Sequence, residues 1–112
     1  MKATMLMAVM GLALSGAAAQ AWERLDDAGI EAALSGRILR LDAWTHQVFH
    51  ADGRTEYHTE RYAEGVWSAR DGRYCSIWPP AADWTCYDLA REGDRLRFTN
   101  DAGIASIGTL EE

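Results

Sequence analysis

Short runs of aromatic and β-branched residues, separated by turn dipeptides that contain glycine, make up the chain from Arg37 onward. The turn dipeptides are Asp52-Gly53, Asp71-Gly72, Glu92-Gly93 and Ala102-Gly103. This spacing is typical of an antiparallel meander of hairpins. The predicted strands are 37–43, 44–50, 54–61, 65–69, 73–78, 84–89, 95–99 and 104–110.

One short helix is predicted before the first strand, over residues 25–36. Asp26 is placed to cap its amino terminus, and Gly36 to end it. Its apolar residues Ile30, Ala33 and Leu34 form one stripe. Eight short strands can curl on themselves, with the helix covering an open end or face. The predicted fold class is therefore mainly β: an antiparallel hairpin meander that forms a small barrel or bent sheet, with one short N-terminal helix.

The first two Asp-Gly turns also predict how the hairpins pair. Each suits a three-residue loop with glycine in the left-handed conformation. In the first hairpin this pairs Phe49 with Thr55 and places Phe49 and Tyr57 on one face of the sheet. In the second hairpin it places Cys75 on the same face as Trp67. The predicted core residues are Phe49, Tyr57, Trp67 and Ile77.

The first 19 residues have the three-part layout of a secretory signal. Lys2 precedes a largely apolar run over residues 3–14, and small residues follow over 15–19. A membrane anchor is the alternative, but the apolar run is shorter than the roughly 20 residues that span a bilayer. We therefore expect cleavage after Ala19, a single domain over residues 20–112, and a periplasmic or secreted location with no membrane attachment.

Two cysteines, Cys75 and Cys86, are the only ones in the chain. In an oxidising exported compartment a lone pair is most simply a disulfide. A redox-active pair or a metal site is the alternative, but each needs a CxxC spacing or a second cluster of ligands. The predicted domain is therefore stapled by one disulfide.

The charge balance excludes two classes of partner. The formal net charge is −6, and it becomes about −7 once Lys2 is removed with the signal. Nucleic-acid and anionic-membrane binding both depend on a basic surface, so neither is expected.

Several hairpin motifs resemble those of a group of small exported bacterial proteins of unknown function. The shared motifs are F-x-x-D-G at residues 49–53, G-x-W at 65–67, D-G-x-x-C at 71–75 and a second cysteine at Cys86. The resemblance covers about residues 34–103. It implies the fold and the periplasmic location, and it implies no catalytic residue.

A transition-metal site is one hypothesis for the chemistry of the chain. The predicted register makes His46 and His58 cross-strand neighbours, with Glu56 and His50 further along the same face. Imidazole and carboxylate ligands suit zinc or copper. The alternative is that these side chains are simply solvated. No other cofactor is predicted.

A nucleophilic enzyme is not predicted. The serines that follow the signal, Ser35, Ser68, Ser76 and Ser106, lie in no G-x-S-x-G motif. The sequence also pairs none of them with a histidine base, so a small hydrolase is disfavoured.

Tryptophans provide the remaining functional signal, because the chain has five. Trp78 and Trp84 flank a loop between the two cysteines. Alternation does not place all three of Trp44, Trp78 and Trp84 in the core. Exposed indoles on a stapled loop suit recognition of a protein or a small apolar ligand, although they can also cover the open end of a thin core. The preferred function is a non-enzymatic binding or interaction module that uses this loop or a barrel mouth; an inhibitor and an accessory factor both belong to this class.

Overall fold

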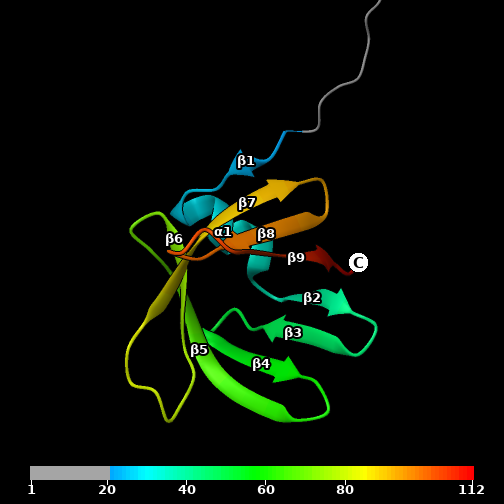
Figure 1. Ribbon diagram of the computed structural model, residues 1–112, viewed down its shortest axis with the longest axis vertical. Coiled ribbons are helices and arrows are strands. Elements are labelled where there is room, and N and C mark those ends of the chain that lie inside the picture. The colour runs from blue at the N-terminus through cyan, green and yellow to red at the C-terminus, as the bar shows by residue number, and fades with distance from the viewer. Residues whose placement is uncertain (1–20) are drawn as a thin grey trace, which may run out of the picture.

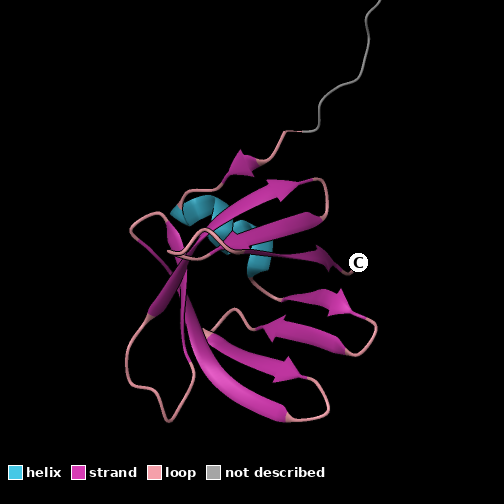
Figure 2. Cartoon of the chain, in the orientation of Figure 1, coloured by secondary structure: helices cyan, strands magenta, loops and turns pink. Residues whose placement is uncertain are grey.

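A computed structural model describes residues 21–112, which form a closed antiparallel barrel of eight strands with one helix (Figures 1 and 2). The predicted fold class is confirmed. The predicted signal, residues 1–19, lies outside the described residues. In chain order the elements are β1 (Glu23–Arg24), α1 (Asp27–Leu34), β2 (Arg37–Asp42), β3 (Thr45–Phe49), β4 (Arg54–His58), β5 (Tyr62–Arg70), β6 (Arg73–Ile77), β7 (Thr85–Glu92), β8 (Arg95–Thr99) and β9 (Ala105–Leu110).

Each barrel strand pairs with the next one along the chain, and the last returns to the first. From β2 to β9 the order in the sheet follows the sequence, and β9 then pairs with β2. This closing seam is short, since its register consists of Leu39 opposite Leu110 and Arg40 opposite Thr109. An Arg40–Glu111 ion pair lies beside it. Strand β1, which the sequence pattern did not predict, adds two residues to the edge of β7.

Helix α1 closes one end of the barrel. The Asp26 carboxylate accepts a hydrogen bond of 2.8 Å from the Gly29 amide, as expected of an N-cap. The helix contacts β2, β5 and β6. Its stripe of Ile30, Ala33 and Leu34 is fully buried in one cluster with inward-facing residues of the barrel. The predicted apolar stripe is therefore the part of the helix that enters the core.

The first hairpin has the predicted register, with Phe49 opposite Thr55 and Gly53 at φ +97°. The prediction for the second hairpin was wrong. Arg70 pairs with Arg73 around a two-residue turn, because Asp71 and Gly72 both have positive φ, at 52° and 80°. Left-handed conformations at both positions define the tight turn that matches the twist of the flanking strands.

This shift of one residue exchanges the two faces of β6. Trp67 lies opposite Ser76, and Cys75 lies opposite Ser68 on the other face. Of the predicted core residues, Phe49 and Trp67 are buried and Tyr57 is half-buried. The prediction for Ile77 was wrong: it shares the outward-facing side with Cys75 and is only half-buried, while Tyr74 and Ser76 point inward.

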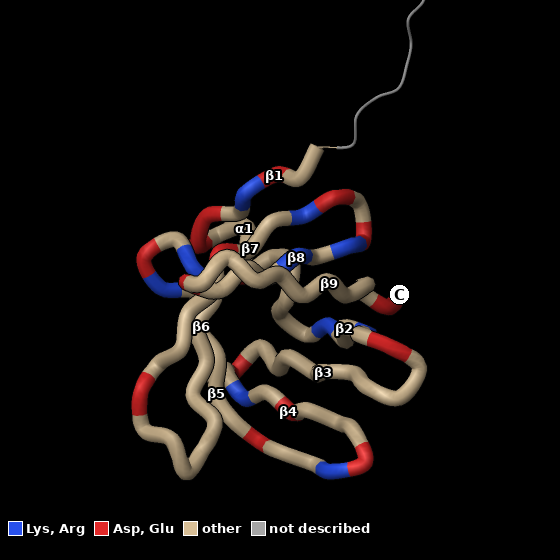
Figure 3. The backbone as a smooth tube through the Cα atoms, viewed as in Figure 1, with Lys and Arg blue, Asp and Glu red and all other residues tan. Residues whose placement is uncertain are grey.

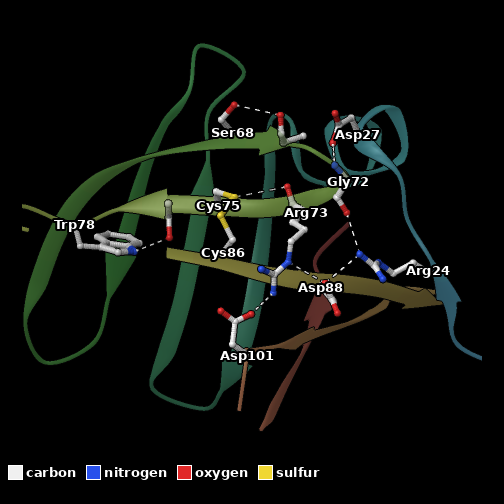
Figure 4. The surroundings of a disulfide bond; sticks show 12 residues. Arg24, Asp27, Ser68, Gly72, Arg73, Cys75, Trp78, Cys86, Asp88 and Asp101 are labelled. Carbon is white, nitrogen blue, oxygen red and sulfur yellow. Dashed lines mark hydrogen bonds and ion pairs between the residues drawn. A yellow bond between two sulfur atoms is a disulfide. The ribbon is translucent and has the colours of Figure 1, made fainter. Parts of the chain in front are cut away.

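The predicted disulfide joins Cys75 on β6 to Cys86 directly opposite on β7 (Figure 4). The Arg73 guanidinium lies near it and binds the carboxylates of Asp88 and Asp101 at 2.9 and 2.8 Å. Arg24 binds the same Asp88 at 3.0 Å and thereby attaches β1 to this part of the barrel. The bond confirms the oxidised state of the two cysteines, which is typical of proteins outside the reducing cytoplasm.

Many of the charged residues lie at or near the turns between strands (Figure 3). Within residues 21–112, no helix has the length and apolar character needed to cross a membrane.

Candidate functional site

A cavity of about 400 Å³ opens at the end of the barrel opposite α1. Its lining residues come from all eight barrel strands and from the residue that follows β6, and they are mainly aromatic and aliphatic. Those on the buried floor and wall are Leu39, Gln47, Tyr74, Ser76 and Phe98. Those nearer the rim are Leu41, Tyr57, Ala63, Trp78, Tyr87 and Ser106. No lining residue carries a formal charge at neutral pH.

Gln47 organises the polar groups on the floor of this cavity. Its side-chain nitrogen donates to the Thr55 hydroxyl at 3.0 Å and to the Tyr74 hydroxyl at 3.2 Å. The Thr55 hydroxyl donates its own proton to the carbonyl of Val48 at 2.8 Å, so it can only accept from Gln47. This fixes which end of the Gln47 amide faces Thr55.

Two tyrosines keep neutral hydroxyl groups at the cavity. Burial raises the pKa of Tyr74 to about 12, against a smaller opposing effect of its polar neighbours Ser76 and Gln47. Burial also raises the pKa of Tyr57, with a smaller contribution from the charge of Asp42. The cavity therefore stays uncharged across the physiological pH range.

Trp78 forms one wall of the cavity because Gly65 leaves room for its ring. A Cβ atom built on Gly65 would lie 2.8 Å from the Trp78 ring and 2.4 Å from the carbonyl oxygen of Ile77. The indole meets the Tyr57 ring edge to face at 6.0 Å between centroids. Its N–H donates to the Ser76 hydroxyl at 3.1 Å (Figure 4). Three separate contacts thus hold the Trp78 ring at the mouth of the barrel.

The three tryptophans predicted to form a recognition surface have different environments. Trp78 lines the cavity. Trp84 is half-buried, with the Arg70 guanidinium 4.5 Å from its ring centroid. Trp44 is 84 % exposed at the turn between β2 and β3, where it borders a shallow hollow with Asp42, Thr45, Thr59 and Glu60. Only Trp78 belongs to the cavity.

The predicted histidine cluster forms on the outer face of β3 and β4. His46 lies opposite His58, and their rings stack in parallel with centroids 4.5 Å apart. The Glu56 carboxylate binds His58 Nε2 at 2.9 Å through one oxygen, and His50 Nε2 through the other. The cross-strand neighbours expected from the register are therefore in contact.

The cluster differs from a preformed metal site. Lone pairs of imidazole lie in the ring plane, so two stacked parallel rings do not direct them at one common point. Both oxygens of Glu56 are already held by imidazole nitrogens. Among residues 21–112, no group of three or more histidine, cysteine, aspartate or glutamate side chains is arranged to hold a metal ion.

Because of its contacts with two histidines, Glu56 contributes to the stability of the fold by an amount that depends on pH. Hydrogen bonds from His50 and then His58 hold the pKa of Glu56 below its ordinary value of 4.5. A carboxyl group whose pKa is lower in the folded state stabilises the fold above the unfolded pKa, and the contribution is lost as the pH falls through the folded pKa.

We therefore expect Glu56→Gln to destabilise the protein at pH 7 and to make less difference as the pH falls below 4.5. Urea unfolding of both proteins between pH 7 and pH 3 measures this. Glu60→Gln is the matched control, because Glu60 is an exposed carboxylate on the loop that follows β4. A gap between wild type and Glu56→Gln that stays constant over this range would contradict the expectation.

Fold and cavity together define a class: a small, closed, up-and-down β-barrel with a plugged end and an uncharged cavity at its mouth. Comparison of the chain with models of protein families, with curated protein sequences and with solved structures gives no match. The cavity and its chemistry are therefore the basis for a functional proposal.

Proposed function

We propose that this protein is a non-enzymatic binding module outside the cytoplasm, which holds a small, uncharged, apolar molecule in the cavity at its barrel mouth. The observation that carries the proposal is the cavity itself, with aromatic and aliphatic walls, a small buried polar group on its floor and no charged lining residue. Ligand pockets of proteins have this composition, and volumes of about 300–1,000 Å³. Eight-stranded barrels have interiors wide enough for one small ligand.

The disulfide supports the proposed location, periplasmic or secreted, because such bonds persist where the environment is oxidising. The environments of the tryptophans favour a ligand over a protein partner at this site. Trp78 faces the cavity, and Trp84 is held by Arg70, so the loop between them does not display both indoles on one free surface.

Titration with N-phenyl-1-naphthylamine, an uncharged fluorophore, tests the proposal. We expect saturable binding with a rise in probe fluorescence. Trp78→Leu should weaken binding about tenfold, since it removes aromatic area from the wall. Trp44→Leu is the matched control and should leave the affinity unchanged, because Trp44 is 84 % exposed and lies outside the cavity.

A second variant blocks the mouth without altering the buried core. Ala63 is exposed at the rim, so Ala63→Arg should fold normally and place a long cation at the opening. We expect it to weaken probe binding, whereas Ala102→Arg, on the exposed loop between β8 and β9, should not. Equal affinities of Ala63→Arg and wild type, or no saturable binding by wild type, would count against the cavity as the binding site.

The alternative function, binding of Cu(II) or Zn(II) by His46, His58 and Glu56, needs a rearrangement of the stacked rings and of the Glu56 hydrogen bonds. Calorimetric titration of the folded protein with each metal tests it. Heat that saturates at micromolar metal, and that His58→Gln abolishes, would support this alternative.

A further inference from the structure

The floor of the cavity carries hydrogen-bonding capacity that the protein itself leaves unused. Gln47 is only 8 % exposed and lines the cavity. Both of its described hydrogen bonds use the side-chain nitrogen, to Thr55 and to Tyr74. Among residues 21–112, no donor binds the amide oxygen of this side chain within hydrogen-bond distance.

Tyr74 presents the complementary group beside Gln47. Its hydroxyl accepts the proton of the Gln47 amide at 3.2 Å, so the proton of the hydroxyl itself is not used in that bond. Ser76 also contacts this hydroxyl, and like Gln47 it lowers the pKa of Tyr74, which is the effect of a donor to the tyrosine oxygen. Neither neighbour therefore uses the proton of the Tyr74 hydroxyl. Tyr74 is 4 % exposed and lines the same cavity. The floor thus offers one acceptor and one donor, next to each other and away from bulk water.

Buried polar groups without partners are costly, and a ligand that supplies the missing partners recovers that cost. A hydroxyl group can do both tasks at once, because it donates one proton and accepts through its lone pairs. A charged group finds no counter-ion in this cavity, so an ammonium or carboxylate ligand would lose its hydration without compensation.

The walls above the floor determine the rest of the ligand. Tyr57 and Trp78 meet edge to face on one side of the cavity, and Tyr87 and Phe98 meet in the same way, at 6.5 Å between centroids. Aromatic rings bind other aromatic rings in offset or edge-to-face contacts that add to simple area burial. A planar ring fits between such walls better than a flexible chain, which would lose more conformational entropy on binding.

We propose that the occupant of the cavity is an uncharged aromatic molecule that carries a hydroxyl group, with the hydroxyl donating to the Gln47 amide oxygen and accepting from the Tyr74 hydroxyl. This inference rests on the proposed binding function and specifies the chemical class of the ligand. Gln47 and Tyr74 are then the residues that determine specificity, and Tyr57, Trp78, Tyr87 and Phe98 supply most of the contact area.

Two probes that differ in one hydrogen-bond donor test this inference: 2-naphthol and its methyl ether, 2-methoxynaphthalene. Quenching of tryptophan fluorescence measures their affinities for the full protein. We expect wild type to bind 2-naphthol about tenfold more tightly, the gain typical of one buried hydrogen bond. Gln47→Met retains the length of the side chain and removes its amide, so the ratio of affinities should fall to about one.

A second variant covers the case in which Gln47→Met fails to fold. Tyr74→Phe removes only the hydroxyl that would donate to the oxygen of the probe. Both probes carry that oxygen, so both should bind more weakly while the ratio of their affinities stays about tenfold and circular dichroism shows the native barrel. Unchanged affinities for both probes would overturn the role of Tyr74. Equal affinities of wild type for the two probes would overturn the role of Gln47 and leave the apolar cavity in place. Binding of neither probe, together with no binding of N-phenyl-1-naphthylamine, would overturn the binding function as well.

Discussion

Gly65→Ala is expected to lower the free energy of unfolding by about 3 kcal/mol, the upper part of the usual range for an overpacked site. The added methyl group would lie 2.4 Å from the backbone oxygen of Ile77, which cannot rotate away. Strands β5 and β6 would have to separate, and the Trp78 ring, 2.8 Å from the same atom, would have to leave its position. Urea unfolding measures the loss, and binding of the naphthylamine probe should weaken in the same variant.

Gly103→Ala is the control for this prediction. Gly103 has φ +84°, and a Cβ atom there would meet nothing within 4 Å. Its replacement therefore reports the conformational cost of a left-handed residue alone, about 1 kcal/mol. If Gly65→Ala costs no more than Gly103→Ala and leaves the probe affinity unchanged, the close contact between Gly65 and Trp78 does not shape the cavity.

The double variant Cys75→Ala/Cys86→Ala is expected to lose a similar amount, about 3 kcal/mol. The two cysteines are 11 residues apart in sequence, and their bond restricts the unfolded chain at that loop. A single small barrel has little stability to spare, so the variant should unfold at clearly lower urea concentration.

Reduction with dithiothreitol distinguishes the effect of the disulfide on stability from the effect of replacing the two cysteine side chains. Dithiothreitol should destabilise wild type by about as much as the double substitution does, and it should have no effect on the double variant. Wild-type stability that is the same with and without reductant, after complete reduction of the thiols, would contradict a stabilising role for the bond.

Much of the fold could be predicted because the turns and the alternation agree with each other. The eight predicted strands correspond to β2 through β9, with ends that differ by a few residues. The helix was predictable from its cap and from the stripe of Ile30, Ala33 and Leu34, all fully buried. The sequence did not decide between a closed barrel and a bent sheet. The pairing of β9 with β2, which closes the barrel, joins residues about seventy positions apart and leaves no local pattern in the sequence.

The error in the second hairpin shows what alternation alone does not decide. Asp-Gly suits both a two-residue and a three-residue turn, and the two differ only in whether the first residue has positive φ. Asp71 adopts φ 52°, so Tyr74 and Ser76 face inward. Two of the residues that line the cavity were therefore assigned to the outer face.

The most informative cavity residue, Gln47, was also missed. Its signal was available, since it lies two positions before Phe49 and therefore faces the same way. A polar side chain at an inward-facing position of a small barrel needs buried partners, and this is a mark of a site. The predicted histidine cluster lies on the outer face of the barrel instead, and of the three predicted tryptophans Trp78 alone lines the cavity.

The short seam between β2 and β9 affects how the barrel folds. Before those strands meet, the sheet has two free edges with unpaired amides and carbonyls, which are templates for another chain. Contacts between distant parts of a sequence form late and slowly. A folding chain therefore loses its free edges only when its final strand pairs with β2, and the interval before that pairing is when it is most prone to aggregate.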